Sequence, residues 1–253
     1  MKHHNLDKQG HTYRILNRRV GKAVHEYNMI SHGDRIAVGL SGGKDSLTMM
    51  WILNRRLESI PVSYELFPIY IDPGFKNGFG KQLESYCNKS GFRLRPAYTD
   101  YGVVAHSRKN RENPCFLCSR LRRKRIFEIA DELGCNKVAL GHNKDDIIET
   151  LFLNICYTGE ISTMVPYQPF FKGKFVVIRP LAFIDEELTT RFAVEQKFPV
   201  FVNPCPSAKT SKRQEIKRIL QQLYGAGKNI KSNIFRSMSR VKTDYLLKQN
   251  SFL

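Results

Sequence analysis

The sequence lacks the features that would place the protein in a membrane or outside the cell. No apolar run among its 253 residues approaches the roughly 18 residues that a membrane-spanning helix needs. The first residues, Met1–Asn5, have no apolar segment of the kind found in signal peptides. We therefore expect a cytoplasmic protein that does not associate with membranes.

Acidic residues are scarce. The chain has 23 Asp and Glu residues against 41 Lys and Arg residues, which gives a formal net charge of +18. Eleven of the basic residues lie in segment 206–253, against only Glu215 and Asp244. Five more crowd the start of one predicted helix: Arg120, Arg122, Arg123, Lys124 and Arg125. This imbalance indicates a polyanionic partner such as nucleic acid. The alternative is a solvated basic face in a protein from a saline or hot environment.

The common phosphate-binding motifs are also absent. Neither GxGxxG nor GxxxxGK[ST] occurs, and Asp45 follows Lys44 where the second motif requires Ser or Thr. Instead, the hexapeptide SGGKDS occupies Ser41–Ser46, directly after an apolar run and before a helical pattern. Small residues let backbone N–H groups approach an anion, and the start of a helix attracts negative charge. A Gly-rich turn without a ligand is the alternative interpretation.

The six cysteines include one CxxC pair, Cys115 and Cys118, but no second pair. The pair by itself fits half a zinc site, a redox pair or a turn, because a four-cysteine zinc site needs two more nearby thiols. Cys205 lies far downstream in the tripeptide PCP, and His106 and His142 remain candidate ligands. The other three cysteines lie in apolar patterns and are predicted to be buried small hydrophobic residues: Cys87, Cys135 and Cys156.

Short apolar strands alternate with amphipathic helices along the chain, which predicts an α/β fold with a parallel sheet covered by helices on both faces. Strands are expected at 35–40, 66–71, 92–98, 137–140 and 199–202. Helices are expected at 12–30, 47–57, 80–90, 117–133, 144–157 and 186–196. The remaining features are a polar loop at 107–113, a hairpin at 170–183 and two basic helices that separate near Gly225–Gly227.

We divide the chain into an N-terminal basic helix (1–30), a main domain (31–205) and a basic helical C-terminal extension (206–253). Three polar segments follow predicted strands of the main domain: Ser41–Ser46, Asp72 and Gly141–Asp146. Ligands of open α/β sheets bind at the carboxyl ends of the strands. We therefore expect these segments to converge on one nucleotide-binding crevice.

The hexapeptide SGGKDS resembles the SGGxDS signature of the PP-loop ATP pyrophosphatases, which cleave ATP between the α and β phosphates and adenylate a substrate. Over about residues 30–220 the chain further resembles the TtcA group of tRNA 2-thiocytidine synthases within that superfamily. Six segments carry this resemblance, in the order seen in the group: Asp72–Phe75, Pro114–Arg123, Ala139–Asp146, Thr150–Asn154, Ile178–Leu181 and Asn203–Cys205. The resemblance implies a Rossmann-like fold of the adenine nucleotide α-hydrolase type.

The resemblance also implies ATP and Mg²⁺ as cofactors. The residues expected to bind the nucleotide are Leu40, Ser41, Gly42, Gly43, Lys44, Asp45, Ser46, Asp72, Gly141, His142 and Asp146. Asp45 is expected to position magnesium, and Asp145 to orient substrate or accept a proton. Arg122 lies one helical turn after Cys118, where its guanidinium is expected to stabilise phosphate or oxyanion charge. A plain basic helix face is the alternative for Arg122, and a charge at a helix start is the alternative for Asp146.

In the TtcA group, three cysteines hold a 4Fe-4S cluster, and their positions match Cys115, Cys118 and Cys205. Ala208 stands where the group usually has a further cysteine, so the resemblance implies three-cysteine ligation with one iron left open for sulfur. The implied reaction is ATP-dependent thiolation of tRNA, by default at C2 of cytidine 32. Its sulfur would come from a cysteine desulfurase or from free sulfide, and a homodimer is expected by analogy.

Two alternatives remain at this point. The first is a cluster-free PP-loop adenylating ligase or amidotransferase acting on tRNA, such as a lysidine-type enzyme, which would not need the three cysteines. The second is a zinc-stapled RNA-binding protein without ATP turnover.

Overall fold

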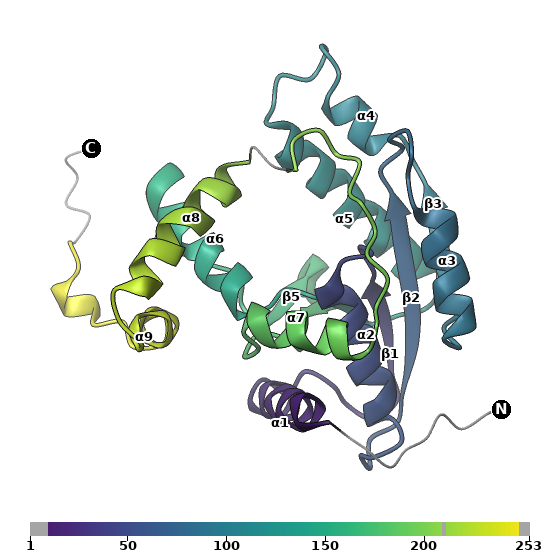
Figure 1. Ribbon diagram of the computed structural model, residues 1–253, viewed down its shortest axis with the longest axis horizontal. Helices are drawn as coiled ribbons and strands as arrows, with labels where there is room; N and C mark the ends of the chain where they lie inside the picture. Colours follow the sequence, from purple (N-terminus) through teal and green to yellow (C-terminus); the bar gives the residue numbers. More distant parts are fainter. Residues whose placement is uncertain (1–9, 209–210, 248–253) are drawn as a thin grey trace.

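A computed structural model describes residues 10–208 and 211–247 (Figure 1). A six-stranded sheet has the strand order β3-β2-β1-β4-β6-β5, in which every neighbouring pair is parallel except β5 with β6. Its strands are β1 (Asp34–Gly39), β2 (Tyr64–Asp72), β3 (Arg95–Tyr98), β4 (Lys137–Leu140), β5 (Tyr167–Phe170) and β6 (Phe175–Ile178). The expected hairpin is confirmed as β5 and β6, joined by a 3₁₀ turn at Phe171–Gly173.

The helices that the structure describes are α1 (His11–Glu26), α2 (Lys44–Arg56), α3 (Gly80–Lys89), α4 (Tyr101–Ala105), α5 (Pro114–Glu132), α6 (Lys144–Tyr157), α7 (Glu186–Glu195), α8 (Lys212–Gly225) and α9 (Ile230–Ser237), with a 3₁₀ turn at Thr243–Tyr245. Asn113 caps α5 by accepting hydrogen bonds from the Cys115 and Phe116 amides, and Pro114 occupies the first helical position. None of the described helices is both long enough and apolar enough to span a bilayer.

The sheet is covered on both faces, as the apolar strands predict. On β1, Ile36 and Val38 pack into a core that α1, α2, α3 and α7 cover. Ala37, which points to the opposite face, packs into a second core with Phe127 and Ile129 of α5. Alternate side chains of one strand therefore enter two separate apolar layers, which is why the strand has few polar residues.

The strand order reverses next to β1. The chain runs outward from β1 through β2 to β3, then returns so that β4 pairs with the other side of β1. Because β1 and β4 are adjacent and parallel, the loop after β1 and the turn after β4 leave the sheet side by side at its carboxyl end, where a crevice is expected. This is the place where the sequence predicted that the scattered motifs meet.

Two local predictions were wrong, and one short helix was not predicted. Residues 199–202 form no strand, and Val200 and Val202 are 92% and 80% exposed. Phe201 between them instead stacks on Phe79, with ring centroids 5.0 Å apart, so the segment crosses the molecule as irregular chain. The sequence also gave no sign of the short helix α4. Finally, Cys156 near the end of α6 is exposed, whereas Cys87 and Cys135 are buried as expected.

The C-terminal helices pack on the domain rather than standing apart. Ile216 and Leu220 of α8 are buried against Ile148 of α6, and Ile234 and Phe235 of α9 pack around the same contact. In Figure 1, α8 and α9 lie beside α6 on one side of the molecule. The predicted boundaries of the three regions stay predictions, and parts of the first and last regions lie outside the described residues (1–9, 209–210 and 248–253).

The N-terminal helix also belongs to the main body of the protein. Leu16, Val20 and Ala23 of α1 are fully buried, and they pack in the core beneath α2 and α7. The apolar face of this helix is therefore used within the chain.

Candidate active site

The loop Ser41–Ser46 joins β1 to α2 and is held by its own hydroxyl groups. The Ser46 hydroxyl accepts a hydrogen bond from the Ser41 amide at 3.1 Å and donates to the Gly43 carbonyl at 2.9 Å. The Gly43 amide donates to the Ser41 hydroxyl at 3.3 Å. Gly42 has φ +78°, and a Cβ there would lie 2.5 Å from the Phe79 ring. These contacts fix a compact turn whose amides lie at the start of α2, where an anion is stabilised.

The turn after β4 lies directly against this loop. A Cβ on Gly141 would lie 2.9 Å from Cα of Ser46, so only glycine permits this approach. Next to it, Asn143 and Asp146 form a reciprocal capping box at the start of α6, with hydrogen bonds of 2.9 and 3.1 Å. The two motifs, about 100 residues apart in sequence, thus form one continuous surface.

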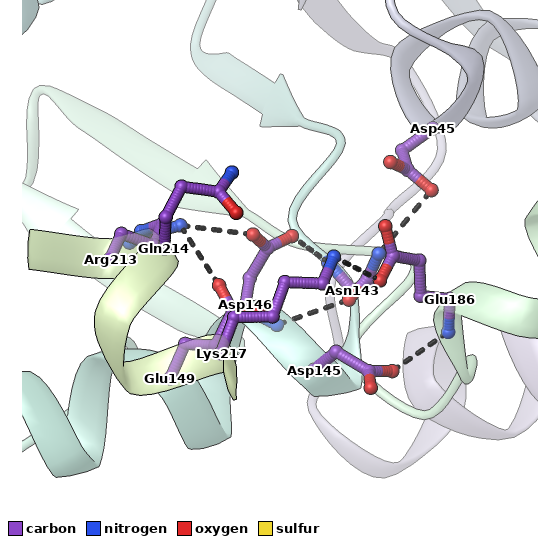
Figure 2. A pocket seen from close by; sticks show the side chains of 9 residues that line it. All are labelled: Asp45, Asn143, Asp145, Asp146, Glu149, Glu186, Arg213, Gln214 and Lys217. Atoms are coloured by element: carbon purple, nitrogen blue, oxygen red, sulfur yellow. Dashed lines mark hydrogen bonds and ion pairs between the residues drawn. The ribbon is translucent and has the colours of Figure 1, made fainter. Parts of the chain in front are cut away.

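A cleft of about 360 Å³ opens over this surface. It is lined by Gly39, Leu40, Ser41, Gly43, Asp45, Ser46, Ile71, Arg122, Ile126, Leu140, Gly141, His142, Asp146 and Arg213. The structure therefore brings together most of the predicted nucleotide-binding residues, and it adds Arg122 from α5. A smaller acidic cavity of about 140 Å³ adjoins it and shares Asp45, Asp146 and Arg213 (Figure 2).

Lys44 is directed away from the cleft. Its Nζ lies 3.1 Å from Asp45 Oδ2 and 3.0 Å from Glu186 Oε1, and these carboxylates raise its pKa against the opposing effect of burial. Asp45 Oδ1 in turn accepts hydrogen bonds from Thr189 and Asn143. The lysine and the carboxylate of the loop are thus paired with each other and with α7.

His142 lies in an electropositive part of the cleft. Burial lowers its pKa to about 3, and nearby guanidinium groups act in the same direction. Those groups belong to Arg179, Arg213 and Arg123. Its Nδ1 atom is buried and has no hydrogen-bond partner among the described residues. The imidazole is therefore neutral at physiological pH.

The three cysteines of interest lie near one another and near Arg122. Burial raises the pKa of the Cys115 thiol, and Cys205 contributes to that rise. The pKa of Cys118 is likewise raised, mainly by burial, while Arg122 opposes the shift. Cys205 and Cys115 contribute to the rise at Cys118. Arg122 therefore lies between the cysteines and the nucleotide cleft, and its buried Nε has no partner among the described residues.

Contacts from α4 hold the segment that carries Cys205. His106 Nε2 lies 2.7 Å from the Ser207 hydroxyl, and its Nδ1 lies 2.8 Å from the Gly102 carbonyl. Within residues 10–208 and 211–247, no three His, Cys, Asp or Glu side chains are already arranged as a metal site. The three thiols thus lie near one another but are not already arranged as a metal site in the described part of the chain.

The carboxylates of two predicted site residues, Asp72 and Asp145, form hydrogen bonds or ion pairs within the protein. Asp72 accepts a hydrogen bond from the Gly74 amide at 2.8 Å, and the end of β2 contributes Ile71 to the lining of the cleft. Asp145 lines the acidic cavity rather than the cleft. One of its carboxylate oxygens accepts a hydrogen bond from the Glu186 amide at 2.7 Å, and the other forms an ion pair with Lys231 of α9.

The chain is similar to known proteins over most of its length. The family model for the PP-loop domain matches residues 12–223. The tRNA-cytidine(32) 2-sulfurtransferase of Geobacter sulfurreducens is 37% identical over 238 residues, which cover 93% of each chain. That of Citrifermentans bemidjiense is 38% identical over 237 residues, or 92% of each chain. The chain belongs to the PP-loop family of tRNA 2-sulfurtransferases.

A solved structure of the same superfamily has the same fold. The U34-tRNA thiolase NcsA from Methanococcus maripaludis, solved with its [4Fe-4S] cluster, aligns with a TM-score of 0.76 at 25% identity. The match covers 93% of this chain and 80% of NcsA. The predicted PP-loop, Rossmann-like fold class is thereby confirmed.

Sequence reasoning missed several side chains of this sulfurtransferase site. Glu186 bridges Lys44 and Lys217, with Nζ–Oε distances of 3.0 and 2.6 Å. Glu149 is buried, and burial raises its pKa to about 7. Arg213, predicted only as part of a basic extension, lines both cavities. No local motif marks these residues, because their positions depend on how α7 and α8 pack against α6.

Proposed function

We propose that this protein replaces a pyrimidine carbonyl oxygen of tRNA with sulfur in an ATP-dependent reaction, with C2 of cytidine 32 as the expected position. The names of the relatives support the reaction and the position. The observation that carries the proposal is the neighbourhood of Arg122. This arginine lines the nucleotide cleft and also acts on the thiol of Cys118, so the cysteines lie beside the place where ATP would bind.

ATP has a clear chemical purpose in such a reaction. A carbonyl oxygen is a poor leaving group, and adenylation converts it into part of AMP. The backbone amides of Ser41–Ser46 would bind the departing pyrophosphate at the start of α2, as helix starts bind anions. Arg122 would stabilise charge that develops on the cysteine side of the cleft.

Asp45 is the proposed ligand for Mg²⁺, since its carboxylate lines both cavities and oxygen atoms are the ligands that magnesium prefers. Binding of Mg²⁺ would weaken the pair between Asp45 and Lys44, and Lys44 would also have to leave Glu186 to reach the phosphates. Asp145 is proposed to orient substrate or accept a proton, which requires release from Lys231 and the Glu186 amide.

Cys115, Cys118 and Cys205 are the proposed ligands of a 4Fe-4S cluster. Cys205 contributes to the raised pKa values of Cys115 and Cys118, so the three thiols lie close together and form a suitable donor set, since such clusters are held by cysteine thiolates. When bound, the cluster would supply sulfur as a nucleophile that stays deprotonated at neutral pH. The positive charge of Arg122 favours the thiolate form of Cys118, which is the form that binds iron.

The tRNA is proposed to bind over the basic surface that surrounds the cleft, and sulfur to come from a cysteine desulfurase or free sulfide. The intact loop and cleft argue against a zinc-stapled binding protein without turnover. The cysteines beside the cleft, together with the names of the relatives, favour thiolation over a cluster-free ligase or amidotransferase.

The test is reconstitution under anaerobic conditions with tRNA, Mg-ATP and sulfide, followed by mass spectrometry of the digested nucleosides. We expect 2-thiocytidine only in the presence of ATP, together with equal amounts of AMP and pyrophosphate. ATP consumption that yields an aminated or amino-acylated nucleoside would instead identify the ligase or amidotransferase alternative.

A further inference from the structure

The C-terminal helix α8 brings a basic side chain into the nucleotide cleft. Arg213 lies in the first turn of α8 and lines the cleft together with Ser41, Gly43 and Ser46 of the phosphate loop. The contact is not a loose surface approach, because Ile216 and Leu220 bury the same helix against α6. Helix α8 therefore contributes to the active site, whereas the sequence indicated only a basic extension.

The side chain of Arg213 is held in a defined orientation (Figure 2). Its Nη1 lies 3.0 Å from Asp146 Oδ1 and 3.7 Å from Glu149 Oε2. Its Nη2 donates to the Thr150 hydroxyl at 3.2 Å. An arginine has five N–H donors, and these contacts along α6 leave others for a ligand. With 39% of its side chain exposed, Arg213 remains accessible from the cleft.

Few cations line the cleft. Lys44 is paired with Asp45 and Glu186, and it is not among the residues that line the cleft. Among the residues that the structure describes, Arg122 and Arg213 are the basic side chains of this lining. Arg122 belongs to α5, the helix that also carries Cys115 and Cys118. Arg213 belongs to α8, about 90 residues later in the sequence. A triphosphate lying on the loop would thus meet a guanidinium from each of two separate helices.

We propose that Arg213 binds the phosphates of ATP and is a further substrate-binding residue of this enzyme. The inference rests on the proposed function in one respect, namely that the cleft binds ATP. Guanidinium groups bind phosphate oxygens with two parallel hydrogen bonds, which a lysine cannot reproduce. Asp146 and Glu149 hold the side chain at the edge of the cleft, ready to contact the nucleotide.

The test compares the binding of α,β-methylene-ATP and of AMP to the full-length protein by calorimetry. For Arg213→Ala we expect about 10- to 100-fold weaker binding of the triphosphate analogue, as for loss of charge-assisted hydrogen bonds, and at most about twofold weaker binding of AMP. Arg213→Lys should restore part of the loss. The matched control is Arg218→Ala, which removes the same charge from an exposed position of α8 and should bind both ligands as the wild type does.

A double variant separates contact from charge balance. If Arg213 acts only by neutralising Asp146, then Asp146→Asn should restore triphosphate binding to Arg213→Ala. If Arg213 contacts the phosphates, the double variant should bind the triphosphate analogue more weakly than Asp146→Asn alone does. Three results would each overturn the inference. They are restored triphosphate binding in the double variant, unchanged triphosphate binding in Arg213→Ala, and an equal loss of affinity for AMP and for the triphosphate analogue in Arg213→Ala. If the wild-type protein binds no ATP analogue, the proposed function is refuted. If the wild type thiolates tRNA but Arg213→Ala binds the triphosphate analogue normally, only this inference is refuted.

Discussion

Glu149 gives the most quantitative prediction about this protein. It lies on α6, is 5% exposed, and has its carboxylate 3.7 Å from Arg213. Burial raises its pKa from 4.5 to about 7, because the attraction of Arg213 offsets only part of the cost of burying the charge. The folded protein therefore binds a proton at Glu149 more tightly than the unfolded chain does.

This difference has a definite sign. Between pH 4.5 and 7 the folded state holds more protons than the unfolded state, so stability falls as the pH rises through this window and is level above it. From pH 5 to pH 8, ionisation of Glu149 should lower the free energy of unfolding by about 2.5 kcal/mol, at 1.36 kcal/mol per pKa unit. Glu149→Gln, which keeps the shape but cannot ionise, should lose this contribution.

The assay is urea unfolding of the wild type and of Glu149→Gln at pH 5 and pH 8. We expect Glu149→Gln to gain about 2–3 kcal/mol relative to the wild type on going from pH 5 to pH 8. Glu187→Gln is the matched control, since the Glu187 side chain is 85% exposed and should show no such gain. An equal difference between Glu149→Gln and the wild type at both pH values would refute the reasoning.

Three further predictions concern packing and the site. Gly141→Ala should weaken ATP binding by at least about tenfold, measured by calorimetry, because its Cβ would lie 2.9 Å from Cα of Ser46; normal affinity would contradict the tight approach of the two loops. Ile216→Ala should lower the free energy of unfolding by about 2–4 kcal/mol, since it removes a fully packed contact of α8 with α6; a loss below 1 kcal/mol would mean that α8 docks weakly. Lys137→Met should lower the free energy of unfolding by about 3 kcal/mol in urea, because it leaves the buried Asp34 carboxylate without its cationic partner, with only the hydrogen bonds from Asn136 and the Ser31 amide; an unchanged midpoint would argue against the ion pair.

Local patterns predicted much of the fold and of the nucleotide site. The apolar run of β1, the small residues of Ser41–Ser46 and the helical pattern of α2 are contiguous, so a short window contains the whole phosphate loop. Because ligands bind at the carboxyl ends of parallel strands, Gly141 and His142 could be predicted to lie at the same crevice, although they follow the phosphate loop by about 100 residues.

The predictions from the sequence failed where contacts between residues far apart in the chain determine the structure. The β-branched residues of 199–202 favour a strand locally, but the stacking of Phe201 on Phe79 and the exposure of Val200 come from tertiary packing. Cys156 lies in an apolar helical pattern, yet the end of α6 that carries it is exposed. Arg213 is one of many basic residues in its segment, and only the docking of α8 on α6 distinguishes it.

The most direct test of the account is the metal content of protein purified without oxygen. The central claim is that Cys115, Cys118 and Cys205 together hold an iron–sulfur cluster beside the ATP cleft. We predict about four iron atoms per chain and a broad absorbance at ~400 nm in the wild type. The same signals are expected in Cys156→Ser, which replaces an exposed cysteine of α6. Both signals should be lost in Cys205→Ser. A colourless wild type that contains zinc, or a Cys205→Ser variant that keeps its full iron content, would contradict the claim.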